Sequence, residues 1–202
     1  MSWQGVNHDW FLAVNHLARV TPAFHALVSF YAEYGVVLFA VVLLGAWWSA
    51  RRSGDPRRVA AALWAPAGAL LAIGLNQPLV RIVHEPRPHT VFPNVLVLVA
   101  RGQDFSFPSD HAVMAGAVTV GVLLVDRRLG VAAAFVAILM GFSLVYVGAH
   151  FPLDVVAGVL FGGAVTLFLF LGLRPLVVLI VTRLARTSLR PVITATPGGF
   201  VR

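Results

Sequence analysis

Five long apolar runs, separated by short polar segments, constrain the fold of this 202-residue chain more than any other feature. The runs are residues 26–48, 59–80, 112–125, 129–148 and 153–173. A helix needs about 20 apolar residues to cross bilayer hydrocarbon, and it satisfies its own backbone polar groups there. Hydrophobic residues make up 59% of the chain and charged residues 11%, which is outside the range of a soluble domain. We therefore expect an all-α integral membrane protein, with a bundle of five to six transmembrane helices.

The N-terminal segment, residues 3–20, mixes apolar and polar residues at spacings that favour an amphipathic helix lying in the membrane interface. Thr21 and Pro22 are predicted to end this helix. Residues 1–10 lack the basic start and apolar core of a secretory signal, so we expect the apolar runs to act as their own insertion signals. Residues 1–202 are predicted to form a single membrane-embedded domain.

All 15 basic residues are arginines, and the sequence contains neither lysine nor cysteine. Arginines cluster at residues 51–58, at 126–128 and along a tail, residues 183–202. Because positively charged loops tend to stay in the cytoplasm, these three segments are predicted to be cytoplasmic, and residues 81–111 and 149–152 extracytoplasmic. The net charge of +7 then indicates topology and contact with anionic lipids, not binding of nucleic acid. The lack of cysteine excludes disulfides and thiolate metal ligands.

Two segments on the extracytoplasmic side have two interpretations each. Residues 91–100 are apolar but too short to span, so they either dip into the bilayer or cover the bundle. Glu33 interrupts the first apolar run near its start, where it lies at the level of the headgroups or faces the bundle interior. Carboxylates inside a membrane tend to be functional, which keeps Glu33 a candidate.

Three polar islands lie at the predicted extracytoplasmic ends of the apolar runs. The islands are residues 85–88, 107–111 and 150–154. Polar groups at such positions are costly to keep in so apolar a chain. Arg81, Arg87 and Arg101 break the arginine rule on this face, as expected if they bind an anionic ligand. We predict that the islands meet in space and handle a phosphate at the membrane surface.

The first two islands carry groups suited to phosphate oxygens. Arg87 presents a planar fork that binds phosphate through two hydrogen bonds, and Pro86 and Pro88 restrict the backbone on both sides of it. Ser109 is a good N-cap for the helix that follows, whose first free amides form an anion site. The alternatives are an arginine that binds lipid headgroups and an ordinary helix cap.

The histidines supply acid–base and nucleophilic chemistry. His111, in the first turn of a predicted helix, can donate a proton to a leaving oxygen near neutral pH. If the turn at Pro152 allows, the four-residue spacing of His150 and Asp154 puts both on one helical face, so the carboxylate can hold one ring nitrogen and leave the other bare as a nucleophile. The alternative is a structural His–Asp pair that closes a loop.

A metal site is the other alternative for these side chains. The candidate ligands are His84, His89, His111, His150, Glu85, Asp104, Asp110 and Asp154. They include no compact zinc motif, such as two histidines four residues apart with a glutamate between them. Several arginines beside the same site would also repel a cation. We therefore expect neither a metal ion nor a cofactor.

Taken in order, the islands resemble the motifs of the type-2 phosphatidic acid phosphatase superfamily of membrane lipid phosphatases. Its pattern is lysine, six residues and Arg-Pro; then Pro-Ser-Gly-His; then Ser-Arg, five residues, histidine, three residues and aspartate. The matching residues are Arg87, Pro88, Pro108, Ser109, His111, Ser143, His150 and Asp154, within residues 80–88, 108–111 and 143–154. The Glu-Pro before Arg87 and the form Phe-Pro-Ser-Asp-His look most like the undecaprenyl-diphosphate phosphatase branch, and the similarity extends from about Phe30 to Leu173.

This resemblance implies a metal-independent reaction in two steps. His150 would attack the terminal phosphorus to form a phosphohistidine, while Asp154 holds and balances its ring. His111 would protonate the departing lipid phosphate and then activate water. Arg87, Ser109 and helix amides would bind the phosphoryl oxygens. Further candidates are Arg81, Asp110, Ser143 and Arg101 at the phosphate, with Glu85 and Pro88 supporting them.

The chain departs from the family pattern at three positions. Val80 stands where the family has lysine, with Arg81 next to it. Asp110 replaces glycine, as the undecaprenyl-diphosphate branch itself does, and Leu144 replaces arginine. Loss of an arginine that stabilises a phosphoryl transition state can cost several powers of ten in rate. We expect Arg81 or Arg101 to compensate; otherwise the protein is slow, altered in substrate or inactive.

The resemblance implies a phosphatase in the bacterial cytoplasmic membrane, with its active site on the extracytoplasmic side. It would convert undecaprenyl diphosphate, or a similar polyprenyl diphosphate, to the monophosphate and so recycle the lipid carrier of cell-wall synthesis. Its expected partners are this substrate and membrane lipids. One alternative is a phosphatase for a glycerophospholipid or another lipid phosphate. The other is a lipid-phosphate binder or transporter without catalysis, which Leu144 favours.

Overall fold

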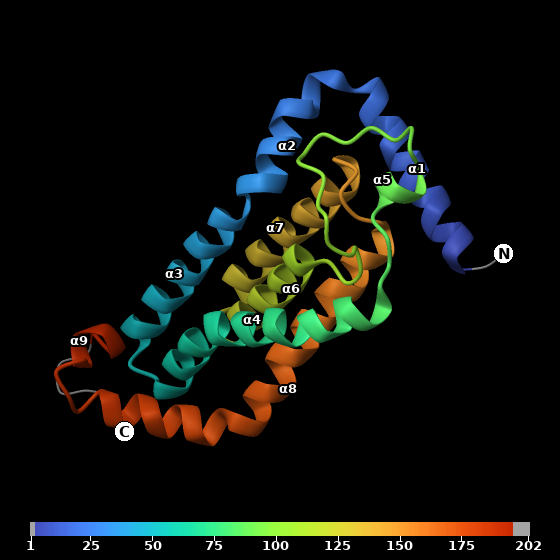
Figure 1. Cartoon of the computed structure of the whole chain (residues 1–202). Coiled ribbons are helices and arrows are strands. Elements are labelled where there is room, and N and C mark those ends of the chain that lie inside the picture. Colours follow the sequence, from blue (N-terminus) through green and yellow to red (C-terminus); the bar gives the residue numbers. More distant parts are fainter. Residues whose placement is uncertain (1–2, 196–202) are drawn as a thin grey trace.

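The structure is a computed structural model that describes residues 3–195, and this part of the chain is all-helical. Residues 1–2 of the predicted start and residues 196–202 of the predicted tail lie outside it. The helices are α1 (Trp3–Val20), the 3₁₀ helix η1 (Pro22–Phe24), α2 (His25–Tyr34), α3 (Val36–Ser53), α4 (Pro56–Val83), α5 (Pro88–Val91), α6 (Asp110–Leu123), α7 (Arg127–Tyr146), α8 (Pro152–Leu184) and α9 (Arg190–Ile193) (Figure 1). The predicted all-α class is confirmed.

Helices α3, α4, α7 and α8 are long and apolar enough to cross a membrane, and α6 is a shorter apolar helix of 14 residues. The chain is therefore a multi-pass membrane protein. The first apolar run, predicted as one segment over residues 26–48, is divided at Gly35 into α2 and α3. Gly35 packs closely, because a Cβ there would lie 2.9 Å from the Cε of Met140.

Helix α6 lies in the centre of the bundle and packs against α4, α7 and α8 (Figure 1). Its approach to α8 is close, since a Cβ added at Gly162 would clash with the carbonyl oxygen of Val113. Small residues let helix backbones approach each other in membranes, where lipid tails are as apolar as the side chains. The N-terminal ends of α6 and α8 are thereby joined, and Ser109 N donates to Asp154 O at 3.2 Å.

The bundle has an arginine-rich end and a polar-loop end. At the arginine-rich end, Arg58 forms a 3.3 Å ion pair with Asp126, and Arg51 donates to Pro191 O at 2.6 Å. Helices α1 and α5, together with the loop between α5 and α6, lie at the other end (Figure 1). The arginine clusters and the polar islands are therefore at opposite ends of the molecule.

Helix α8 continues to Leu184, beyond the end of its predicted apolar run at residue 173, and contains Pro175. Figure 1 shows α8 bending, with its C-terminal part crossing the arginine-rich end toward α9. A proline inside a helix removes one backbone donor and crowds the preceding turn, which accounts for a bend. Part of the predicted tail is therefore a continuation of the last membrane helix.

Helix α1 lies against the polar-loop end with two asparagines facing the protein. Buried Asn7 accepts a hydrogen bond from Leu153 N at 3.0 Å. Buried Asn15 donates to Leu96 O at 2.8 Å and accepts from Leu96 N at 3.0 Å. α1 thus fixes both the start of α8 and the apolar segment around Leu96, which covers the bundle.

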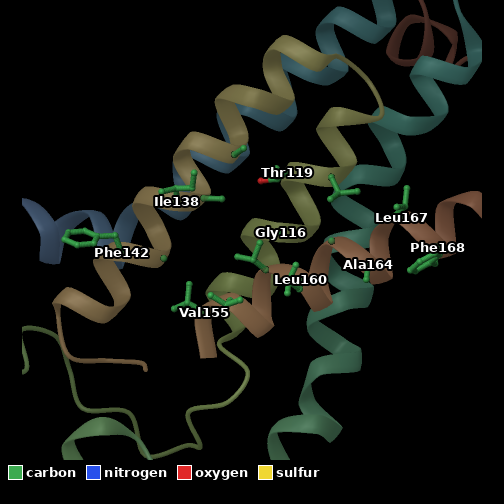
Figure 2. A pocket seen from close by; sticks show the side chains of 16 residues that line it. Gly116, Thr119, Ile138, Phe142, Val155, Leu160, Ala164, Leu167 and Phe168 are labelled. Atoms are coloured by element: carbon green, nitrogen blue, oxygen red, sulfur yellow. The ribbon is translucent and has the colours of Figure 1, made fainter. Parts of the chain in front are cut away.

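An apolar cavity of about 620 Å³ lies between α6, α7 and α8 (Figure 2). Gly116, Phe142, Leu160 and Phe168 are among the residues that line it. These residues belong to the apolar part of the bundle, and the cavity shares no lining residue with the polar cavities described next.

Candidate active site

The three polar islands meet at the polar-loop end of the bundle, where they border two cavities. The larger, of about 400 Å³, is lined by Gln77, Val80, Arg81, Arg87, Asp104, Phe105, Pro108, Asp110, His111 and His150. The smaller, of about 260 Å³, lies toward α2 and α7. Arg87, His111 and His150 line both. These three side chains therefore lie between the two cavities.

His150 follows a tight turn between α7 and α8. Gly148 has a φ of +78°, and a Cβ there would clash with the carbonyl oxygen of Leu96. A left-handed backbone with no room for a side chain favours glycine. The backbone N–H groups of Ala149 and His150 then both donate to Leu144 O, at 3.0 and 3.3 Å. The turn thus fixes the backbone that carries the imidazole.

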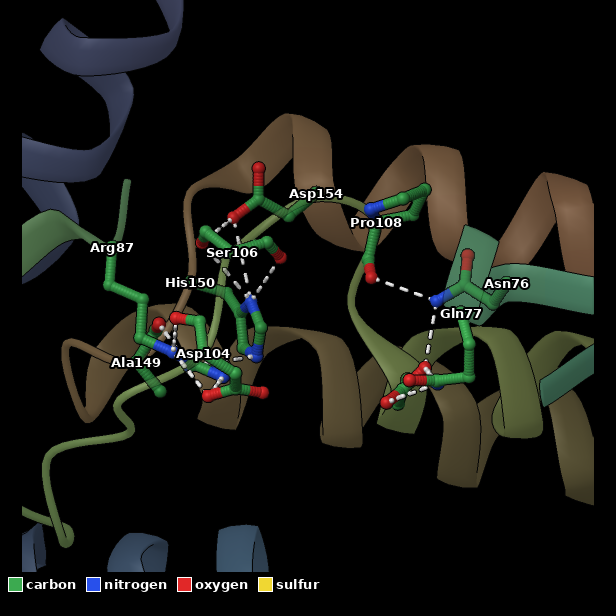
Figure 3. A network of polar contacts seen from close by, with 10 residues as sticks. Asn76, Gln77, Arg87, Asp104, Ser106, Pro108, Ala149, His150 and Asp154 are labelled. Carbon is green, nitrogen blue, oxygen red and sulfur yellow. Dashed lines mark hydrogen bonds and ion pairs between the residues drawn. The ribbon is translucent and has the colours of Figure 1, made fainter. Parts of the chain in front are cut away.

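The imidazole of His150 is buried, with 5% of the residue exposed. Its Nδ1 lies 2.9 Å from the backbone oxygen of Ser106, and its Nε2 lies 3.4 Å from Nη1 of Arg87 (Figure 3). A carbonyl oxygen only accepts, and a guanidinium only donates. In neutral His150 the proton is therefore on Nδ1, and the unprotonated Nε2 turns its lone pair toward Arg87.

Asp154 is fully buried in the first turn of α8. Its Oδ2 accepts hydrogen bonds from Phe151 N, at 2.8 Å, and from the hydroxyl of Ser106. The same oxygen lies 3.5 Å from His150 Nδ1. Oδ1 has no hydrogen-bond partner within residues 3–195. The histidine and aspartate are neighbours, but they do not share a helical face, because α8 begins at Pro152 and His150 lies in the turn before it. The nearest partner of Nδ1 is the carbonyl of Ser106.

Ser106 is a site residue that sequence reasoning missed. It is fully buried, and its backbone N–H donates to Glu85 O at 2.8 Å. It lies in an irregular loop, where no periodic pattern marks a buried side chain. The one sequence signal is its place three residues before Ser109, at the edge of the middle motif.

Arg87 is held by the loop that precedes α6. Its Nη2 and Nε lie 2.8 and 3.2 Å from Oδ1 of Asp104, and its Nη1 donates to Ala149 O at 3.1 Å (Figure 3). Gly102 lets the loop pass close by, because a Cβ there would lie 2.7 Å from Arg87 Nε. Only 13% of the Arg87 side chain is exposed. The guanidinium is thus fixed beside the lone pair of His150.

Ser109 and Asp110 begin α6 with different surroundings. Ser109 is at the N-cap position, but its buried hydroxyl makes no hydrogen bond within the part of the chain that the structure describes. The carboxylate of Asp110 accepts from Asn76 at 2.7 Å and from Gln77 at 3.0 Å. Asn76 also donates to Pro108 O at 3.0 Å (Figure 3). These two side-chain amides of α4 join that helix to the start of α6.

The remaining predicted phosphate ligands differ in their placement. Arg81 is exposed and lines the larger cavity. Arg101 is exposed as well, but it is not among the residues that line either cavity. Ser143 is buried, and its hydroxyl donates to Met140 O at 2.7 Å within α7. Of the three, Arg81 is therefore the one beside the larger cavity.

The supporting positions lie around these groups. Pro88 is buried at the start of α5, and half-buried Glu85 is tied to Ser106 through its backbone. Glu33, on α2, and buried Leu144 both line the smaller cavity. Glu33 thus borders the site on the side where the family pattern places an arginine. In residues 3–195, the histidines, aspartates and glutamates form no group of three or more that could hold a metal ion.

Together these groups meet the needs of phosphoryl transfer through a covalent intermediate. His150 offers a bare nitrogen as nucleophile, and Arg87 places a fixed positive charge 3.4 Å from it. His111 borders the same cavities and is of a type that transfers protons near neutral pH. Ser109 is fully buried and is not among the residues that line either cavity, but its hydroxyl is unpartnered within residues 3–195 and lies at the start of a helix, where backbone amides favour anions.

Known proteins with similar sequences include several that are phosphatases by name. Residues 61–177 match the family described as the PAP2 superfamily. The chain is 31% identical over 180 residues to undecaprenyl-diphosphatase BcrC of Bacillus subtilis (strain 168), which covers 87% of this chain and 90% of that protein. It is 32% identical over 139 residues to decaprenylphosphoryl-5-phosphoribose phosphatase of Mycobacterium tuberculosis (strain ATCC 25618 / H37Rv), covering 68% of this chain and 72% of that protein.

Two solved structures share the fold. A PAP2-type phosphatidylglycerolphosphate phosphatase from Bacillus subtilis has a TM-score of 0.57 and 22% identity, covering 85% of this chain and 86% of its own. LpxE of Aquifex aeolicus has a TM-score of 0.54 and 23% identity, covering 81% of this chain and 93% of its own. Because the family match extends over more than half of the residues, the chain belongs to the PAP2 superfamily, as the order of its motifs predicts.

Proposed function

We propose that this protein is a lipid phosphatase that hydrolyses undecaprenyl diphosphate, or a polyprenyl diphosphate of similar length, to the monophosphate. Membership of the PAP2 superfamily supports the lipid phosphatase activity. The similarity to BcrC of Bacillus subtilis, over most of both chains, supports a diphosphate substrate. In this role the protein returns the lipid carrier of cell-wall synthesis to use in the bacterial cytoplasmic membrane.

One observation carries the proposal. The Nε2 lone pair of buried His150 lies 3.4 Å from the guanidinium of Arg87, in cavities that His111 also lines. A nucleophile, a fixed positive charge for the phosphoryl oxygens and an acid–base group are the parts that a two-step phosphatase needs.

In the first step, the lone pair of His150 Nε2 attacks the terminal phosphorus, and a P–N bond forms as the bond to the bridging oxygen breaks. His111 gives its proton to that oxygen, which leaves with the lipid monophosphate. In the second step, His111 takes a proton from water, whose oxygen attacks phosphorus and breaks the P–N bond. Arg87, the Ser109 hydroxyl and the first amides of α6 hold the phosphoryl oxygens in both steps.

The arginine clusters favour an extracytoplasmic site. Arg51, Arg58 and their neighbours lie at the end of the bundle opposite the cavities. Since arginine-rich loops tend to remain in the cytoplasm, the phosphatase site is on the outer side of the membrane.

Leu144 favours a second candidate, a lipid-phosphate binder without catalysis. It is buried beside the smaller cavity where the family pattern has an arginine, so that clamp is missing from the site. We favour the phosphatase, because Arg81 lines the larger cavity and can bind the same oxygens. Arg101, the other predicted substitute, is outside the set of residues that line the two cavities.

The test is phosphate release from undecaprenyl diphosphate by the purified, detergent-solubilised protein, with and without EDTA. Release is expected to persist in EDTA and to fall at least about a thousandfold in His150→Ala, because the variant has no nucleophile. His16→Ala, on the exposed side of α1, is the matched control and is expected to retain activity.

Phosphatidylglycerol phosphate and a polyprenyl phosphosugar phosphate serve as competing substrates in the same assay. Faster turnover of either substrate would contradict the proposed specificity for a diphosphate, but it would still support lipid phosphatase activity. If no lipid phosphate is hydrolysed but Leu144→Arg creates activity, the wild-type protein is a binder and the proposed reaction is wrong.

A further inference from the structure

We propose that Ser106 is the positioning residue of the His150 nucleophile. Its backbone carbonyl fixes the tautomer of the imidazole, and its hydroxyl holds the carboxylate of Asp154 beside the ring. This inference rests on the phosphohistidine reaction proposed above. From the sequence alone, the four-residue spacing of His150 and Asp154 makes the aspartate the expected group that orients the ring. In the structure, the closest acceptor to Nδ1 of the ring belongs instead to Ser106, in the loop before α6.

The carbonyl of Ser106 is the acceptor that Nδ1 of His150 meets most directly. The distance is 2.9 Å, compared with 3.5 Å from Nδ1 to Oδ2 of Asp154. On the other side of the ring, Nη1 of Arg87 donates toward Nε2 at 3.4 Å. An acceptor at one nitrogen and a donor at the other both require the proton on Nδ1. The lone pair needed for attack is thus placed on Nε2 without help from the carboxylate.

The hydroxyl of Ser106 has a separate role. It has one proton, which it donates to Oδ2 of Asp154, so its 3.4 Å approach to His150 Nδ1 is not a second donated bond. Together with Phe151 N, at 2.8 Å, it keeps the carboxylate oxygen next to the ring. There the negative charge stabilises the positive ring that forms when His150 becomes bonded to phosphorus.

Ser106 is itself rigidly held. It is fully buried, and its N–H donates to Glu85 O at 2.8 Å. Asp104, two residues earlier in the same loop, binds the guanidinium of Arg87. This loop therefore aligns the nucleophile and the arginine with each other, which is the precision that a preorganised site needs.

The decisive measurement is the tautomer of His150, read from the side-chain ¹⁵N chemical shifts of the purified, ligand-free protein. His150→Gln identifies the signal by removing it. We expect the neutral ring to carry its proton on Nδ1 in the wild type, and to keep it there in Asp154→Asn, because the Ser106 carbonyl is unchanged. A shift of the proton to Nε2, or a mixture of tautomers, in Asp154→Asn would overturn the inference.

Kinetics test the hydroxyl. Ser106→Ala is expected to lower kcat about tenfold, the effect of losing one hydrogen bond to a charged group, and to leave KM unchanged. The double variant Ser106→Ala/Asp154→Asn is expected to be no slower than Asp154→Asn alone, since the hydroxyl acts through the carboxylate. If the loss of kcat in the double variant equals the product of the losses in the two single variants, Ser106 acts independently of Asp154 and has another role. If the wild type releases no phosphate, the proposed function is wrong. The ¹⁵N measurement of the His150 tautomer still tests the role of Ser106 in that case, because it needs no turnover.

Discussion

Backbone atoms hold the side chains that are proposed to react in this site. The Nδ1 of His150 meets the carbonyl of Ser106, Nη1 of Arg87 donates to the carbonyl of Ala149, and Oδ2 of Asp154 accepts from a backbone amide. Such partners come from the path of the chain and do not depend on another side chain taking the right rotamer. A buried charge or donor with a fixed partner avoids the cost of an unsatisfied group.

The two arginines that were predicted to compensate for Leu144 differ in a way that kinetics can detect. Arg81 lines the larger cavity, so Arg81→Ala removes a charged donor from the phosphate and is expected to raise KM about tenfold. Arg101 does not line either cavity, so Arg101→Ala is expected to change KM by less than about twofold.

Steady-state phosphate release by the two variants, at the same ionic strength, measures this difference. A larger loss in Arg101→Ala than in Arg81→Ala would mean that the loop before α6 rearranges when substrate binds, and that Arg81 is not the substitute.

At the scale of helices, the contact between α6 and α8 determines where two of the candidate catalytic residues lie. The first turn of α8 carries Asp154 and the first turn of α6 carries His111. Ser109 N donates to Asp154 O, so the two turns are joined directly. Glycines in α8 make this approach possible, because a Cβ at Gly162 would meet the backbone of α6.

Gly162→Ala is therefore expected to destabilise the protein by about 1–3 kcal/mol, since the helices must separate to admit the methyl group. The matched control is Gly172→Ala in the same helix, where an added Cβ meets nothing within 4 Å. The control is expected to be neutral or slightly stabilising, because alanine has the higher helix propensity. Thermal unfolding in detergent measures both, and equal unfolding temperatures for the two variants would contradict the role of this contact.

For the molecule as a whole, apolar runs and arginine clusters predict the membrane helices well. They do not predict the break at Gly35, because nothing in the local sequence shows that this glycine packs closely against Met140 of the distant helix α7. They also miss the continuation of α8 through Pro175, since proline inside a membrane helix is tolerated but is not distinguishable in sequence from a helix end.

The candidate site follows the same division. Arg87, His111, His150 and Asp154 are recognisable because each lies in a motif with fixed local spacing. Ser106 and Asn76 are not, because their partners are 48 and 34 residues away and depend on how a loop and α4 pack. The spacing of residues within a motif predicts which side chains lie close together in one turn. Contacts between segments that are far apart in the sequence can be known only from the folded structure.

The orientation of the whole molecule can be tested because the sequence has no cysteine. Gln103→Cys places a thiol in the exposed loop near the site, and Ser188→Cys places one at the arginine-rich end. In intact cells a membrane-impermeant maleimide is expected to label the first variant, and the second only after permeabilisation, because arginine-rich ends tend to be cytoplasmic. The reverse labelling pattern would place the phosphatase site in the cytoplasm.

The two cavities that meet at Arg87, His111 and His150 have a consequence for the order of events in a catalytic cycle. In the proposed two-step reaction, His111 serves both the leaving lipid oxygen and the attacking water, so both would lie on the same side of phosphorus, opposite Nε2 of His150. Water would therefore take the place that the lipid monophosphate vacates, and the smaller cavity would give it a second route to His111 besides the larger one. The lipid product would leave first and inorganic phosphate last.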